Sequence, residues 1–175
     1  MNRNVRIAKE LVRIAKSMIA MPAMGGRPAP NRMNSLSLMC SQVCQMCMTN
    51  LMNNISEFMI AYGFTLHNSG QVEMYTHEWE KGGKKVIIKE KDDHSMNHRL
   101  TVSVYKDGNE ILSIDFVNLS SFRDEIIDEI SGILRKFADH TKMNSEVNKV
   151  VDKYSKWLIN ENSSNISDVR NAVRQ

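Results

Sequence analysis

Two runs of alternating apolar residues, one on each side of the dipeptide Asp107-Gly108, set the first limit on the fold of this chain. The apolar positions are Leu100, Val102, Val104, Leu112, Ile114 and Phe116. Alternation at every second residue is the period of a β-strand, and an Asp-Gly pair between two such runs is typical of a tight hairpin. The predicted hairpin has one apolar face, so other elements have to cover that face.

A second hairpin is predicted just before the first. Residues 72–79 and 84–91 alternate in the same way, and Lys81-Gly82-Gly83 between them supplies glycines for a turn. Because the two hairpins follow each other along the chain, we expect a four-stranded antiparallel meander.

Helical spacing flanks this region on both sides. From Ser35 to Tyr62, apolar residues recur at steps of three and four, and Gly63 is expected to end the helix. After the strands, one helix is predicted over residues 120–137, capped by Ser120 or Ser121, and another over residues 145–160. The fold class is therefore α+β, with a helix, a four-stranded meander and two C-terminal helices.

The chain divides into four parts. Residues 1–20 are predicted to form a basic amphipathic helix, because Val5-Arg6-Ile7-Ala8-Lys9 recurs seven residues later and seven residues make about two helical turns. Residues 21–34 hold all three prolines and are expected to be a flexible linker. The α+β domain is predicted over residues 35–161, and residues 162–175 are expected to be a polar tail that frays.

Positive charge is concentrated in the first part of the chain. Residues 1–62 carry seven basic side chains and two acidic ones. Such an arm is expected to seek an anionic surface, which a nucleic acid, a membrane or an acidic protein can provide. The residues predicted to dock on a partner are Val5, Arg6, Lys9, Leu11, Val12, Arg13, Lys16, Met18 and Ile19.

Three cysteines, Cys40, Cys44 and Cys47, lie within eight residues of one another. Their spacing also occurs in the cluster-binding triad of radical enzymes that use S-adenosylmethionine, where the triad lies on a loop. Here the cysteines continue a helical stripe, and the helical rise separates Cys40 and Cys47 by roughly 10 Å along the axis. We therefore expect buried packing residues in a reducing compartment and no metal or cofactor at the cysteines.

Four potential metal ligands, Asp92, Asp93, His94 and His98, are predicted to lie in the loop that joins the second and third strands. Their spacing lacks a helix or strand that would aim both imidazoles at one point. A solvated loop is the simpler interpretation, and no metal site is predicted there.

The polar face of the predicted sheet offers a possible nucleic-acid surface. The residues expected on that face are Tyr75, His77, Trp79, Lys85, Lys89, Thr101, Ser103 and Tyr105. Aromatic rings among lysines can stack bases and hold phosphates. Cross-strand aromatic pairs also stabilise ordinary solvated sheets, and the last helix could cover this face instead.

The segment from Arg6 to Lys16 resembles the short basic helices that open many small tailed-bacteriophage proteins of uncharacterised role. This resemblance implies a virion-associated or head-packaged accessory protein that uses its N-terminal helix for docking or targeting. It also implies the cytoplasm of a host cell, or a virion, as the location.

We therefore predict a non-enzymatic interaction protein that docks on a larger assembly through its N-terminal helix. The alternative is a nucleic-acid-binding protein that uses the basic arm together with the aromatic and lysine face. The longest uncharged stretch, residues 33–56, is rich in Ser, Thr, Asn and Gln, so no transmembrane segment is predicted.

Overall fold

The computed structural model describes residues 30–70, 74–93 and 97–175. The basic segment 1–20, with all its predicted docking residues, lies outside these ranges. The described elements are α2 (Pro30–Ala61), β1 (Thr65–Gly70), β2 (Met74–Lys81), β3 (Lys84–Asp93), β4 (Asn97–Lys106), β5 (Asn109–Asp115), the short 3-10 helix η2 (Ser120–Phe122), α3 (Arg123–Lys136), α4 (His140–Glu161) and α5 (Ser163–Arg174). This arrangement confirms the predicted α+β class.

The strands form one antiparallel sheet in the order β1-β2-β3-β4-β5, so each strand pairs with its neighbours in sequence. The predicted meander is confirmed, but it has five strands rather than four, because β1 was not predicted. Between β4 and β5, Asp107 and Gly108 both have positive φ, at 52° and 83°. Two consecutive positive φ angles are what the tight turn of a hairpin requires, and Asp-Gly adopts them readily.

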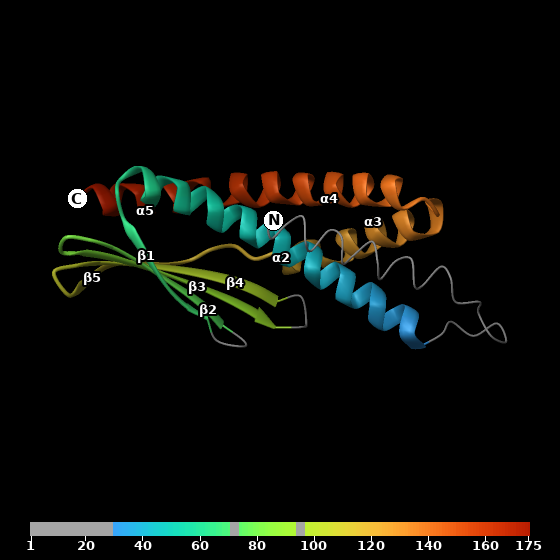
Figure 1. Cartoon of the computed structure of the whole chain (residues 1–175), viewed down its shortest axis with the longest axis horizontal. Coiled ribbons are helices and arrows are strands. Elements are labelled where there is room, and N and C mark those ends of the chain that lie inside the picture. Colours follow the sequence, from blue (N-terminus) through green and yellow to red (C-terminus); the bar gives the residue numbers. More distant parts are fainter. Residues whose placement is uncertain (1–29, 71–73, 94–96) are drawn as a thin grey trace.

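The helices gather on one side of the sheet, as Figure 1 shows. α2 packs on α3 and α4 and also contacts β4, while α5 lies against β4 and β5. In the same view, α3 and the first half of α2 extend beyond the end of the sheet. One sheet face is therefore covered by helices, and the other faces outward.

α2 owes its length to a continuous stripe of buried residues and ends where Gly63 allows it to end. The stripe includes Met39, Cys40, Val43, Cys44, Cys47, Met48, Leu51, Ile55 and Met59. Gly63 has a φ of 83°, its N–H donates to the Ile60 carbonyl at 3.0 Å, and the Phe64 N–H donates to the Met59 carbonyl at 3.0 Å. This pair of bonds is a Schellman motif, so the predicted helix stop is confirmed.

The N-terminal boundary of α2 differs from the prediction. The helix begins at Pro30, so residues 30–34, which were expected in the linker, are helical. Proline fits the first turn of a helix because the N–H that it lacks has no intrahelical acceptor there.

The prediction of a frayed polar tail is also wrong, because residues 163–174 form the helix α5. This helix buries Ile166, Val169, Ala172 and Val173. Asn162 fixes the turn before it: this fully buried side chain accepts from the Val117 N–H at 2.8 Å and donates to the Leu158 carbonyl at 2.8 Å. The tail is therefore part of the core.

The caps of the other two helices differ from the prediction as well. Phe122 occupies the position before α3 and supplies no side-chain cap, because Ser120 and Ser121 belong to η2. α4 begins at His140, earlier than expected, where the carboxylate of Asp139 accepts from the Thr141 N–H at 2.8 Å.

Candidate functional site: the open face of the sheet

The three cysteines are core residues of α2. Cys40, Cys44 and Cys47 are fully buried on α2, which confirms their predicted packing role. The Cys47 thiol donates to the carbonyl oxygen of Val151 on α4 at 3.6 Å. Burial raises the pKa of Cys40 and of Cys47 from 9.0 to about 12, so both remain protonated thiols at neutral pH. A protonated thiol is a poor nucleophile and a poor metal ligand.

Asp92, Asp93 and His98 lie in strands, whereas a loop was predicted for them. Asp92 and Asp93 are the last residues of β3, and His98 lies within β4, opposite Asp92 in the register. His98 is fully buried on the covered side, while residues 94–96 lie outside the described chain. Among the residues that the structure describes, no group of three His, Cys, Asp or Glu side chains could hold one metal ion.

The register of β2 corrects the predicted nucleic-acid face. Trp79 lies opposite Val86 and His77 lies opposite Ile88, so both side chains lie on the covered face. Tyr75 lies opposite Glu90 in the register. Trp79 is only 4% exposed. The aromatic side of β2 therefore belongs to the core side, and the acids of β2 alternate onto the other face.

The remaining members of the predicted face do lie together on the open side. They are Lys85, Lys89, Thr101, Ser103 and Tyr105, on β3 and β4. Two of these residues make side-chain contacts with β5. Thr101 donates to the carboxylate of Asp115 at 2.7 Å, and the hydroxyls of Ser103 and Ser113 lie 3.4 Å apart. The open face is thus a polar surface with ordered cross-strand contacts.

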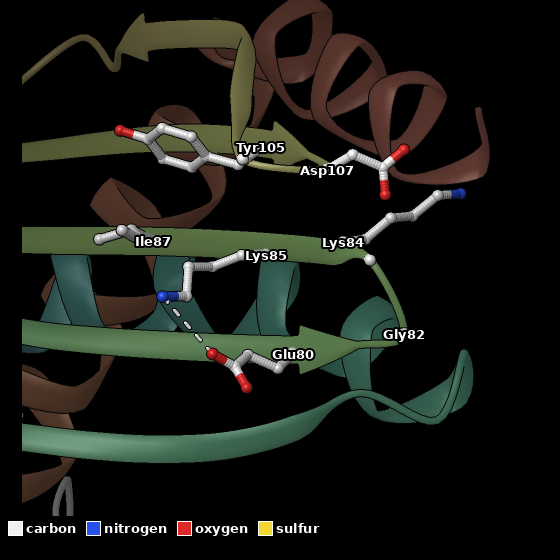
Figure 2. A pocket seen from close by; sticks show the side chains of 9 residues that line it. Glu80, Gly82, Lys84, Lys85, Ile87, Tyr105 and Asp107 are labelled. Atoms are coloured by element: carbon white, nitrogen blue, oxygen red, sulfur yellow. Dashed lines mark ion pairs between the residues drawn. The ribbon is translucent and has the colours of Figure 1, made fainter.

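A shallow cavity of about 470 Å³ lies at the hairpin end of this face (Figure 2). Its lining residues are Glu80, Gly82, Gly83, Lys84, Lys85, Ile87, Tyr105, Asp107 and Gly108. The Lys85 ammonium lies 3.5 Å from a Glu80 oxygen and 3.7 Å from a Glu78 oxygen, and the former pair is visible in Figure 2. The cavity thus combines a neutralised ion pair with the apolar surfaces of Ile87 and Tyr105.

The two hairpin turns that border this cavity are joined by a hydrogen bond. The Asp107 N–H donates to the Gly83 carbonyl at 2.8 Å, and a side chain added at Gly83 would come within 2.3 Å of the Asp107 carboxylate. A side chain at position 83 would therefore require the exposed Asp107 carboxylate to move. This arrangement can hold a small polar or aromatic group by hydrogen bonds and stacking.

A second cavity, of about 380 Å³, lies between α3 and α4 and was not predicted from the sequence. Ile133, Phe137 and Val150 give it an apolar floor. Its rim carries both charge signs, including the ion pair between Lys153 and Glu129. The rim thus favours neither an anionic nor a cationic ligand.

No protein-family model matches the chain, and comparison with curated proteins and with solved structures gave no match. None of the described helices combines the length and apolarity needed to cross a membrane.

Proposed function

We propose that this chain is a non-enzymatic interaction protein that is held on a larger assembly by its basic N-terminal segment. The observation that carries the proposal is the place where this segment joins the domain. Pro30 opens a helix of 32 residues, which spans about 48 Å at 1.5 Å per residue. Its first turns extend beyond the end of the sheet (Figure 1). The start of α2 therefore lies at the end of the domain away from the β2–β3 and β4–β5 turns (Figure 1).

The chemistry of residues 1–20 suits docking on a protein groove. The apolar positions Val5, Leu11 and Val12 repeat at helical spacing, and arginines and lysines follow beside them. In such a mode the apolar stripe enters the groove, and the cations increase the association rate through electrostatic attraction. The phage resemblance makes a virion, or the cytoplasm of a host cell, the proposed location.

The test compares the full chain with the double variant Leu11→Asp/Val12→Asp and with a chain that lacks residues 1–29. Both changes should abolish association with the partner assembly and leave circular dichroism and Tm of the domain unchanged. The matched control is Ile111→Asp, since Ile111 is an exposed apolar residue of β5. Association that survives loss of residues 1–29 would contradict the proposal.

A second candidate function, nucleic-acid binding, is favoured by one observation on the open face. Lys91 lies opposite Arg99, next to Lys89, and all three side chains are exposed. Within the described residues, no carboxylate lies within ion-pair distance of any of them. Because Trp79 is buried, it cannot stack on bases, and Tyr105 is an aromatic ring that remains on this face.

This candidate makes a distinct prediction. Binding of oligothymidylate should weaken steeply with salt, with a log–log slope of about −0.7 for each phosphate contacted. The variant Lys89→Ala/Arg99→Ala should flatten that slope, and Lys142→Ala/Lys156→Ala on α4 is the control with the same loss of charge. A flat salt response of the unmodified chain would exclude this function.

A further inference from the structure

Two aromatic rings of α2 carry three cations at the end of the domain where α2 stops. The rings of Phe58 and Tyr62 lie one helical turn apart with their centroids 4.5 Å from each other. The guanidinium carbons of Arg170 and Arg174 lie 5.7 Å and 5.4 Å from the Phe58 centroid. The Lys81 ammonium lies 5.5 Å from the Tyr62 centroid. We call these five residues, from α2, β2 and α5, the cation–aromatic cluster.

The cations of this cluster have no acidic partner in the described part of the chain. The ion pairs found there involve Lys85, Lys149, Lys153 and His67, and none involves Lys81, Arg170 or Arg174. A guanidinium stacked on a ring keeps its N–H edge available for a carboxylate. Since the stacking already orders these side chains, a carboxylate that binds them has less conformational entropy to remove.

Two residues of this region expose apolar surface. Tyr62, a member of the cluster, is 38% exposed, and Leu66 is 37% exposed. Leu66 lies opposite Trp79 in the register of β1 and β2, so it shares a sheet face with Lys81, which follows Trp79 by two residues. Large apolar side chains together with tyrosine and arginine are the composition of protein–protein interfaces. A nucleic-acid backbone would use the cations but would leave Leu66 in water.

We infer that the cation–aromatic cluster, with Leu66, is a docking site for an acidic segment of a partner protein that also carries apolar side chains. The partner's carboxylates pair with Lys81, Arg170 and Arg174, and its apolar side chains cover Tyr62 and Leu66. This site lies on the folded domain and does not depend on the N-terminal segment, so it can fail or succeed independently of the proposed function.

The test uses the full chain and a fluorescein-labelled peptide in which glutamates surround a leucine-phenylalanine pair. Fluorescence polarisation should show binding that falls on the order of 30-fold in Lys81→Glu/Arg174→Glu. Both positions are exposed, so the fold should persist, as circular dichroism can verify. Lys142→Glu/Lys156→Glu changes the net charge equally on exposed positions of α4 and should change binding by less than about threefold.

Two further variants distinguish the apolar contacts of the site from its ion pairs. Leu66→Ser should weaken binding of the peptide and not that of polyglutamate, while Ile111→Ser on β5 should weaken neither. The inference is overturned if the peptide does not bind, if the α4 variant loses as much affinity as the cluster variant, or if oligothymidylate displaces the peptide better than an unlabelled copy does.

Discussion

The two faces of the sheet have the same backbone and opposite chemistry. In β3, Ile88 is fully buried beneath the helices, whereas its neighbour Ile87 lies on the open face and lines the cavity at the hairpin end. The covered face is held by close packing, and the open face by ion pairs and hydroxyl contacts that remain in contact with water. The covered face therefore accounts for most of the stability of the sheet, and the open face is available for binding.

The largest expected difference between the two faces is the effect of removing an aromatic ring from each. Trp79→Ala should lower the free energy of unfolding by about 3–5 kcal/mol, because it empties a buried site. Tyr105→Ala should lower it by no more than about 1 kcal/mol, because that ring lies on the open face. Urea unfolding measures both values. Equal costs would mean that the assigned register of β2 is wrong.

Adjacent residues of one strand give a closer comparison. Ile88→Ala should cost about 2–5 kcal/mol, while Ile87→Ala should cost less than about 1 kcal/mol, although the same atoms are removed. Thermal and urea unfolding of the two variants provide the measurement. A cost for Ile87→Ala as large as that for Ile88→Ala would indicate that the open face is covered in solution.

The thiols on the covered side predict a loss of stability at alkaline pH. Cys40 and Cys47 ionise at a pKa of 9.0 when exposed and of about 12 when folded. The contribution of these two thiols to the free energy of unfolding is complete below pH 9.0. It decreases as pH rises toward 12, because the unfolded chain releases these protons first. The free energy of unfolding should then fall with a slope that reaches about 1.4 kcal/mol per pH unit for each thiol. Urea unfolding at several pH values between 9.0 and 12 measures this slope.

The variant Cys40→Ala/Cys47→Ala is the control for this prediction. Its unfolding free energy should be lower at neutral pH, because two buried sulfurs are lost, but its alkaline slope should be shallower than that of the unmodified chain. An unchanged slope would show that other groups cause the alkaline loss.

The smallest effect is expected on the open face itself. Lys85→Ala removes contacts with Glu78 and Glu80, but the Lys85 side chain is 41% exposed. The cost should be about 0.2–1 kcal/mol and should shrink with added salt. A cost above about 2 kcal/mol would mean that this face is not a solvated surface.

The sequence was sufficient to predict the antiparallel meander and the cysteine stripe of α2, because both depend on regular apolar spacing. It misplaced the aromatic side of β2, since Tyr75, His77 and Trp79 were interpreted as a binding face. Glu78 and Glu80 alternate with Trp79, and carboxylates need water, so these acids were the signal for the correct face. A shift of one residue moves every side chain of a strand to the other face.

Two elements were missed for a different reason. β1 has the sequence TLHNSG, which contains Asn, Ser and Gly in place of a β-branched run, and its strand form depends on pairing with β2. α5 did carry a signal, because Ile166, Val169 and Val173 follow helical spacing. Its abundance of polar residues concealed the apolar side that packs on β4 and β5.

The packing of α2 against α4 has a consequence for synthesis of the chain. Cys47 and its acceptor Val151 are 104 residues apart, so α2 is made long before α4, its main packing partner. At a translation rate of about 5–20 residues per second, that interval lasts roughly 5–20 s. During this time α4 does not yet cover the methionine- and cysteine-rich side of the nascent helix. Ribosome-associated chaperones and oxidants therefore meet this side before α4 does.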